Sequence, residues 1–306
     1  MEVAAVEKTK NGLSCVRLGN INNFSVERIF DCGQCFRFDR VENSKHDAEF
    51  SGVAFGKVIS VAQDGDTVYI YNSTSEEVNA IWRDFLALDE DYDAIARDIA
   101  SRSDNPALSR AIEYGRGIRI LRQEPWETIC SFIISQNNNI PRIKKIISSL
   151  SERCGERIDV PPEMLPHLSP LTVPYSFPTP EVLAELGVDG LSELKVGFRA
   201  KYIYDAATKA ERGEIDYELL FNTEHTADAL EHLCGIKGVG PKVASCALLF
   251  GFSRYDAFPI DVWIKKVIEK YFCDSSKKLS DFSPAELGKY AGIAQQYLFY
   301  YERWNG

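Results

Sequence analysis

The chain has 306 residues, of which 45% are hydrophobic and 26% are charged, and its formal net charge is −10. This composition is ordinary for a globular protein and excludes a wholly disordered one, and the length allows about two domains. The apolar runs are too short to cross a bilayer, and residues 1–8 lack the features of an export signal. We therefore expect an intracellular protein without a membrane partner, in the cytoplasm or nucleoid of a prokaryote or the nucleus of a eukaryote.

The N-terminal third of the chain is predicted to form an antiparallel sheet. Strand patterns, meaning apolar alternation or enrichment in β-branched and aromatic residues, occur over residues 35–39, 50–61 and 67–71. Asp64-Gly65 is a turn signal that leads into the last of these segments. Sheet strands joined by such short turns run antiparallel.

Helical signals dominate after residue 73. Thr74 followed by Glu77 resembles a capping box that opens a helix through Leu88. Starting prolines and closing glycines predict further helices over residues 125–136, from 141, and over 180–187, 200–212, 226–233, 241–250, 260–271 and 284–302. Residues 161–180 are rich in proline and indicate a long connection. The fold class is therefore α+β: an N-terminal antiparallel β-sheet domain with flanking helices at 1–105, then a mostly helical domain at 106–306.

Eight scattered cysteines in a long chain do not indicate a disulfide framework. Cys32 and Cys35 form a Cys-x-x-Cys pair, which is typical of a redox couple or half a zinc site. No second pair follows at ligand spacing, and none of the four histidines lies in a ligand pattern, which disfavours zinc. Only Cys273 follows Asp261, so no four-cysteine iron-sulfur loop can form there. We expect no cofactor, no iron-sulfur cluster and no catalytic metal.

The run Ile236-Lys-Gly-Val-Gly-Pro-Lys242 predicts a hairpin that leads directly into a helix. Gly238 and Gly240 let the backbone turn tightly and approach a ligand, and Pro241 suits a first helical turn. Unpaired N–H groups at such a helix start favour a phosphate, which is how helix-hairpin-helix elements hold a DNA backbone. Gly238, Val239, Gly240 and Lys242 are thus candidate DNA contacts. The alternative is a tight helical connection with a surface lysine.

The acidic net charge does not exclude nucleic acid, because phosphate contacts are local. Residues 116–157 carry eight basic and four acidic side chains, a local charge of +4. Residues 75–98 carry eight acidic and two basic ones, which indicates a solvated face directed away from DNA. Basic clusters are common on protein surfaces, so this feature supports DNA binding only weakly.

Several blocks, in one order from about Cys32 to the C-terminus, resemble the 8-oxoguanine DNA glycosylase/AP lyase family. They are the hairpin with Lys242, Pro259–Val262, Leu121–Pro125, Ser131–Arg142, Gly197–Tyr202 and Ala291–Phe299. The resemblance implies a base excision repair enzyme of the helix-hairpin-helix class. Such an enzyme excises 8-oxoguanine from double-stranded DNA, preferably opposite cytosine, and then cleaves the strand at the abasic site. We expect it to act as a monomer.

The resemblance assigns the chemistry to Lys242 and to Asp261, nineteen positions later. The Lys242 amine, if neutral, would attack C1′ of the damaged nucleotide and form a Schiff base that undergoes β-elimination. Partial burial, a nearby cation or the adjacent helix start would lower its pKa. Asp261 would stabilise the positive charge that develops on the sugar. Without the resemblance, Asp261 is simply a favourable N-cap, and it can serve both roles.

The resemblance also implies a lesion pocket. Cys246 and Phe299 would pack on the two faces of the flipped base, and Gln295 would bond its Watson–Crick edge. The Gly33 carbonyl would accept the hydrogen that oxidation places on N7, which guanine lacks. By themselves, Cys246 and Phe299 resemble core residues, and Gly33 resembles an ordinary turn.

A base inside a duplex must rotate out before it can meet Lys242, so other groups must occupy the gap. By resemblance, Asn137 would fill the space, Phe198 would wedge the stack, and Arg142 and Arg199 would bond the unpaired cytosine. Otherwise Asn137 belongs to a polar turn and both arginines are solvated. The family often has tyrosine where Phe198 stands, so a hydroxyl contact is lost while the wedge is retained.

Two other departures concern the phosphate contacts. Lys237 replaces a proline common in the hairpin, and Trp263 stands where animal enzymes tend to have histidine. The family's hairpin often binds a monovalent or divalent cation through carbonyls, which here would be those of Cys234, Ile236 and Val239.

Two other functions are alternatives to a glycosylase/lyase for 8-oxoguanine. One is a catalytically silent DNA-binding module, which would need neither Lys242 nor Asp261. The other is a glycosylase of the same scaffold that acts on an alkylated or oxidised pyrimidine, whereas Gly33, Gln295 and Phe299 together favour the purine lesion.

Overall fold

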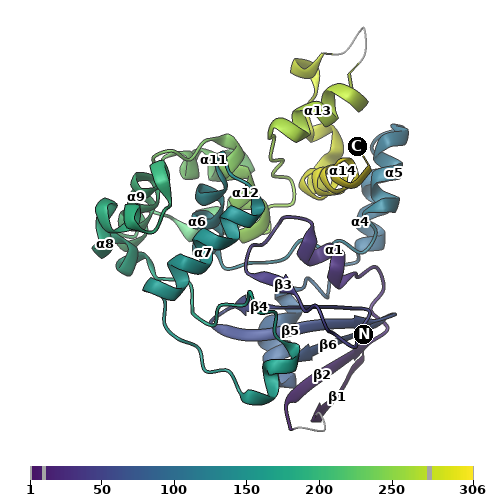
Figure 1. Cartoon of the computed structure of the whole chain (residues 1–306). Coiled ribbons are helices and arrows are strands. Elements are labelled where there is room, and N and C mark those ends of the chain that lie inside the picture. Colours follow the sequence, from purple (N-terminus) through teal and green to yellow (C-terminus); the bar gives the residue numbers. More distant parts are fainter. Residues whose placement is uncertain (1, 9–11, 274–277, 306) are drawn as a thin grey trace.

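The computed structural model describes residues 2–8, 12–273 and 278–305. Within these residues, six strands form one antiparallel sheet in the order β1-β2-β6-β5-β4-β3. They are β1 (Glu2–Lys8), β2 (Ser14–Gly19), β3 (Phe38–Arg40), β4 (Ala48–Ala54), β5 (Lys57–Asp64) and β6 (Thr67–Tyr71). Most of the helices lie above the sheet in two groups (Figure 1), so the predicted α+β class is confirmed.

Two turns explain where the strand predictions hold and where they fail. Asp64 pairs with Thr67 across a two-residue loop whose Gly65 has φ 57°, as predicted. Residues 50–61 are not one strand: Phe55 and Gly56, at φ 51° and 67°, reverse the chain between β4 and β5. Residues 35–39 pair only from Phe38 onward. A two-residue hairpin loop hidden in an apolar run has no strong composition signal.

The helical predictions are confirmed for most elements. The helices before the long connection are α1 (Val26–Asp31), α2 (Ser75–Glu77), η1 (Val78–Trp82), α3 (Arg83–Phe85), α4 (Tyr92–Ser101), α5 (Pro106–Tyr114), α6 (Pro125–Ser135) and α7 (Ile140–Cys154). Those after it are α8 (Pro180–Glu193), η3 (Gly197–Arg199), α9 (Ala200–Glu211), α10 (Tyr217–Asn222), α11 (Thr226–Cys234), α12 (Pro241–Gly251), α13 (Val262–Tyr271), η4 (Leu279–Asp281), η5 (Pro284–Tyr290) and α14 (Ala291–Asn305).

Two details of the helices differ from the prediction, and the break at Gly187 agrees with it. The capping box of Thr74 and Glu77 is present, but a π-helical turn interrupts the helix that follows it. Gly187, with φ 67°, lies at a kink that separates two helices within α8, so the predicted end there is confirmed. Residues 284–302, predicted as one helix, contain η5, which is kinked at Gly288 with φ 72°, and then α14. Local breaks of this kind depend on packing rather than on periodicity.

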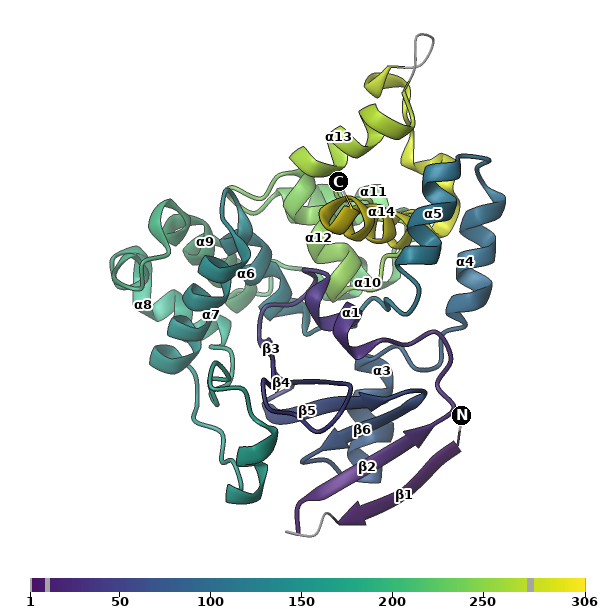
Figure 2. The ribbon, with the colours of Figure 1, turned by 45° about the vertical axis from the view of Figure 1, so that its right-hand side comes forward.

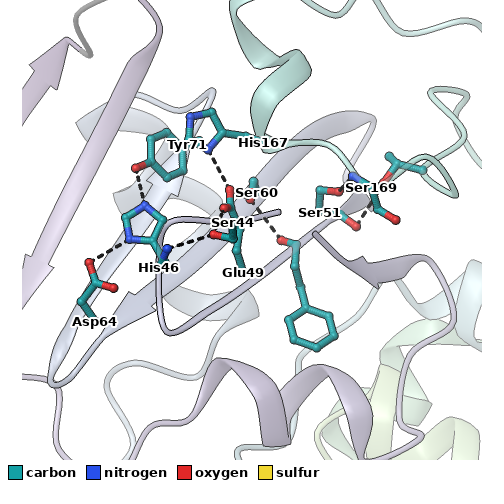
Figure 3. A network of polar contacts seen from close by, with 11 residues as sticks. Ser44, His46, Glu49, Ser51, Ser60, Asp64, Tyr71, His167 and Ser169 are labelled. Carbon is teal, nitrogen blue, oxygen red and sulfur yellow. Dashed lines mark hydrogen bonds and ion pairs between the residues drawn. The ribbon is translucent and has the colours of Figure 1, made fainter. Parts of the chain in front are cut away.

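The predicted long connection between α7 and α8, which we call the strap (residues 155–179), lies against the sheet (Figures 1 and 2). It contains the 3₁₀ turn η2 (Pro162–His167), whose Met164 is fully buried in a small cluster with sheet residues. His167 Nδ1 donates to Glu49 at 2.8 Å, and the Ser169 amide donates to Ser51 Oγ at 2.7 Å (Figure 3). The strap is therefore fastened by polar as well as apolar contacts.

The helical part is organised around one large apolar cluster that includes residues from α4 to α14. The sheet has its own cluster, which α1 and residues 78–88 cover. Cys32 and Cys35 are free and buried in these two cores, and burial raises the pKa of Cys32 to about 12. No helix among the described residues has the length and apolar character needed to cross a membrane.

Candidate active site and DNA-facing surface

Lys242 lies at the start of α12, immediately after the hairpin. Gly240 is the N-cap and Pro241 the first helical residue, as predicted. Gly238 has φ 78°, and a Cβ there would lie 2.5 Å from the Tyr202 ring, so this position requires glycine. The Lys242 Nζ atom lies 5.5 Å from the centroid of the Phe132 ring. The hairpin thus fixes the start of the helix that carries the amine.

Asp261 caps α13, and it also faces the same cavities as Lys242. Its Oδ1 atom accepts hydrogen bonds from the amides of Trp263 at 2.9 Å and Ile264 at 2.8 Å. Among the described residues, no donor reaches Oδ2. The cap orients the carboxylate and leaves one oxygen available, so the structural role and a chemical one are compatible.

Two cavities meet at Lys242 and Asp261. The larger, of about 460 Å³, is lined by residues that include Asn138, Asn139, Ile140, Trp263, Glu302 and Arg303. The smaller, of about 70 Å³, contains all six residues predicted for catalysis and lesion binding: Gly33, Lys242, Cys246, Asp261, Gln295 and Phe299. The structure therefore brings these six residues together from α1's C-terminal turn, α12, α13 and α14.

One polar group of the smaller cavity is buried without a complete set of partners. Gln295 is only 5% exposed, and its Oε1 atom has no hydrogen-bond partner among the described residues. An unpaired buried amide oxygen costs about 1–3 kcal/mol. Burial raises the pKa of Cys246, whereas the nearby Lys242 opposes that shift. Buried polar groups left without partners are typical of a site that awaits a ligand.

Gly33 follows α1 in a left-handed conformation, with φ 82°. A Cβ at this position would lie 3.6 Å from Ile140 and 3.7 Å from the Phe299 ring, which is the wall of the cavity. The predicted turn before a strand is thus also part of the pocket.

The four residues predicted to fill the gap in the duplex lie at the α6–α7 turn and the adjoining η3. Asn137 is exposed with φ 48°, and Phe198 is 50% exposed. Arg142 is exposed in the first turn of α7. Arg199 is buried and donates to the carbonyls of Gln136 and Asn137, while its guanidinium lies 4.4 Å from the centroid of the Phe198 ring. Arg199 therefore braces the Asn137 turn, a role that its sequence context does not indicate.

The basic residues of 116–157 do not form one surface. Arg119 is buried and donates to backbone carbonyls of residues 22, 23, 87 and 90, and Arg122 pairs with Asp84 and Glu90. Lys144 pairs with Asp39 at 2.8 Å. These three basic side chains are therefore bonded within the protein, whereas Arg142 is exposed at the candidate DNA surface.

Several lining residues were not predicted from the sequence. Phe132 stacks on Phe250 with centroids 5.3 Å apart and faces both cavities, but in a helical apolar run it resembles any core residue. Glu302 and Arg303 reach the larger cavity from the last helix. The cation site at the carbonyls of Cys234, Ile236 and Val239 stays a prediction. Of these three carbonyls, that of Ile236 accepts a hydrogen bond from the Val239 amide at 3.0 Å.

Two family models together match most of this chain. Residues 18–129 match the family "8-oxoguanine DNA glycosylase, N-terminal domain", and residues 130–290 match the "HhH-GPD superfamily base excision DNA repair protein". A solved Clostridium acetobutylicum 8-oxoguanine glycosylase/lyase, in complex with double-stranded DNA containing cytosine opposite 8-oxoguanine, is 38% identical, with a TM-score of 0.85. That match covers 100% of this chain and 99% of the solved one.

Curated relatives are similar over shorter or more divergent stretches. The N-glycosylase/DNA lyase of Saccharomyces cerevisiae is 36% identical over 53% of this chain and 44% of that protein. The N-glycosylase/DNA lyase OGG1 of Arabidopsis thaliana is 26% identical over 88% of this chain and 75% of that protein. From the matched domains and the solved relative of equal extent, the chain belongs to the 8-oxoguanine DNA glycosylase/lyase family of base excision repair enzymes.

Proposed function

We propose that this chain excises 8-oxoguanine from duplex DNA, preferably opposite cytosine, through covalent attack by Lys242. The observation that carries the proposal is the convergence of an amine, a carboxylate and an unpaired buried amide on one small cavity. A silent DNA-binding module would gain nothing from Gln295, because a buried oxygen without a partner only destabilises it.

The reaction follows from the atoms that line the cavity. The Lys242 nitrogen uses its lone pair to form a bond to C1′, and the glycosidic bond breaks with its electrons moving to the base, which takes up a proton. The nitrogen then loses a proton as the C1′–O4′ bond breaks and O4′ becomes a hydroxyl, which leaves a protonated imine on the opened sugar. The imine acidifies the C2′ hydrogens, so loss of one of them expels the 3′ phosphate by β-elimination. Water then hydrolyses the imine and restores the amine. Asp261 offsets the positive charge on the sugar and imine.

Lesion recognition follows from the pairing capacity of the pocket. The Gln295 Oε1 atom can accept from the N–H groups of the base's Watson–Crick edge, which would end its unpaired state. Phe299 supplies an aromatic face, and Cys246 supplies a small soft one. The Gly33 carbonyl accepts the N7 hydrogen of 8-oxoguanine, whereas guanine would oppose it with a lone pair.

Preference for cytosine follows from the surface at the α6–α7 turn. Phe198 is exposed and large enough to wedge between bases, and Asn137 projects from a strained left-handed turn that Arg199 braces. The exposed Arg142 offers guanidinium donors, which suit the O2 and N3 acceptors of an unpaired cytosine. The double-stranded lesion DNA is thus held from both sides of the gap.

Borohydride trapping tests the proposal directly. We expect a covalent adduct when the chain is incubated with an 8-oxoguanine·cytosine duplex and borohydride, because reduction fixes the imine. The adduct is expected to vanish in Lys242→Gln and to persist in Lys289→Gln, whose exposed lysine lies outside both cavities. An equal adduct in Lys242→Gln refutes the assignment. Equal adduct rates opposite all four bases would refute the cytosine preference alone.

A further inference from the structure

Three successive carbonyls at the end of α1 differ in their pairing. The Cys32 carbonyl accepts from Gln296 Nε2 at 2.8 Å, and the Gln34 carbonyl accepts from Gln123 Nε2 at 2.8 Å. Between them, the Gly33 carbonyl has no hydrogen-bond partner among the described residues. The Gly33 carbonyl, which is assigned to lesion recognition, is therefore free to accept a hydrogen bond, whereas the carbonyls on either side of it already accept one.

The Gln34 side chain fixes this turn to residues 119–121. It is fully buried, and its Nε2 donates to the carbonyls of Ile29 and Arg119, both at 2.8 Å. Its Oε1 atom accepts from the Leu121 amide at 2.8 Å. A buried amide bonded at three points cannot rotate without leaving polar groups unpaired, so it joins α1 rigidly to residues 119–121.

The segment to which Gln34 is bonded is itself fixed. The Arg119 guanidinium donates to the carbonyls of Asn22 and Asn23, both at 3.0 Å. The Ile120 amide donates to the Tyr92 hydroxyl at 2.7 Å. The turn therefore rests on α4 and on the chain before α1, and these contacts lie outside the cavity.

Gln296 links the same turn to the helix that carries Gln295. The two glutamines are consecutive in α14: Gln295 lines the smaller cavity with an unpaired oxygen, and Gln296 bonds the backbone beside Gly33. The Gln295 side chain and the Gly33 carbonyl, which are proposed to read the base, are thus linked through the hydrogen bond between Gln296 and the Cys32 carbonyl.

We propose that Gln34 and Gln296 are positioning residues that hold the Gly33 carbonyl where it can test the base for a hydrogen on N7. This inference rests on the proposed function, because it assigns to these side chains the geometry of that recognition. Hydrogen bonds weaken steeply outside about 2.7–3.2 Å, so a turn that drifts by a fraction of an ångström loses the distinction between the oxidised and normal base. Gln34 lines neither cavity, and the Gln296 amide, although it lines the smaller one, bonds the Cys32 carbonyl rather than Lys242 or Asp261.

The test compares two reactions that both use the Lys242 amine, of which only one requires recognition of the damaged base. One is single-turnover excision of 8-oxoguanine opposite cytosine, and the other is cleavage of a preformed abasic site in the same duplex. The variants are Gln34→Met and Gln296→Met, which keep similar volume and remove the amide. The control is Thr172→Val, which also removes a polar group at similar volume, but whose hydroxyl bonds Ser51 where the strap meets the sheet, away from α1.

We expect the ratio of excision to abasic cleavage to fall about tenfold or more in both variants, the equivalent of one hydrogen bond, and to stay unchanged in the control. Gln296→Met severs a single bond, so it keeps the test valid if Gln34→Met does not fold. A parallel fall of both rates, or an unchanged ratio, overturns the inference while leaving the proposed function intact. A wild-type chain that performs neither reaction overturns both.

Discussion

The lesion pocket and the junction between strap and sheet are both buried and polar, yet they satisfy their polar groups differently. In the junction, the buried Glu49 accepts hydrogen bonds from His167 at 2.8 Å, Ser60 at 2.7 Å and Ser44 (Figure 3). In the pocket, the Oε1 atom of the equally buried Gln295 accepts none from the described residues. Buried polar groups that are all hydrogen-bonded stabilise the fold, whereas a buried acceptor without a donor can bind a ligand.

The same contrast is visible in the charges. Burial alone would raise the pKa of Glu49, but the hydrogen bonds from His167, Ser44 and Ser60 hold it below its ordinary value. Burial raises the pKa of Glu127, beside the sheet–helix boundary, to about 6, although Arg37 lies 3.2 Å away. Several donors can hold the pKa of a buried carboxyl below its ordinary value, and one ion pair is not sufficient to do so for Glu127.

The largest expected effect comes from breaking the junction. Glu49→Ala should lower the free energy of unfolding by about 3–5 kcal/mol, because it leaves the buried Ser60 hydroxyl and the half-buried His167 and Ser44 without their acceptor. Urea denaturation measures this loss, with the exposed Glu42→Ala as the control. Excision per folded molecule should be unchanged, and a matching loss of excision would show that the two regions are coupled.

A smaller effect is expected from the pocket, and on a different quantity. Gln295→Met should slow 8-oxoguanine excision by about 10- to 100-fold, since the base loses partners worth about 1–3 kcal/mol. Because the variant removes an unpaired buried oxygen, the free energy of unfolding should hold steady or rise. A loss of stability comparable to that of Glu49→Ala would contradict the contrast between the two regions.

The smallest effect is a pH dependence of opposite sign in the two carboxyl groups. The raised pKa of Glu127 means that its contribution to stability is complete below about 4.5 and is lost as the pH rises through about 6. The lowered pKa of Glu49 means that its contribution is present above its ordinary value and is lost as the pH falls.

Unfolding free energies of wild type, Glu127→Gln and Glu49→Gln between about pH 4 and pH 7 measure these contributions. Subtracting each variant from wild type should give curves of opposite slope, on the order of 1 kcal/mol for Glu127. Parallel curves would show that the carboxyl groups share one environment.

Local features were predictable from the sequence because they depend on neighbours along the chain. The capping box at Thr74, the hairpin start at Pro241 and the N-cap at Asp261 all form within a few residues of their signals. The candidate pocket residues were identified by resemblance to a family, and the structure places them around one cavity. Their spacings alone do not distinguish Cys246 or Phe299 from core residues.

Only the tertiary structure decided which polar groups are paired. Arg119 and Arg199 look like surface charges in the sequence, yet both are buried against backbone carbonyls. Gln34 belongs to no recognised motif, although the partners of its side chain lie as far as 87 residues away in the chain. Turn and cap chemistry is local, whereas burial and hydrogen-bond satisfaction depend on segments that meet only after folding. The sequence by itself therefore determined the elements and the candidate chemistry, and the packed fold decided which donors and acceptors remain free for a damaged base.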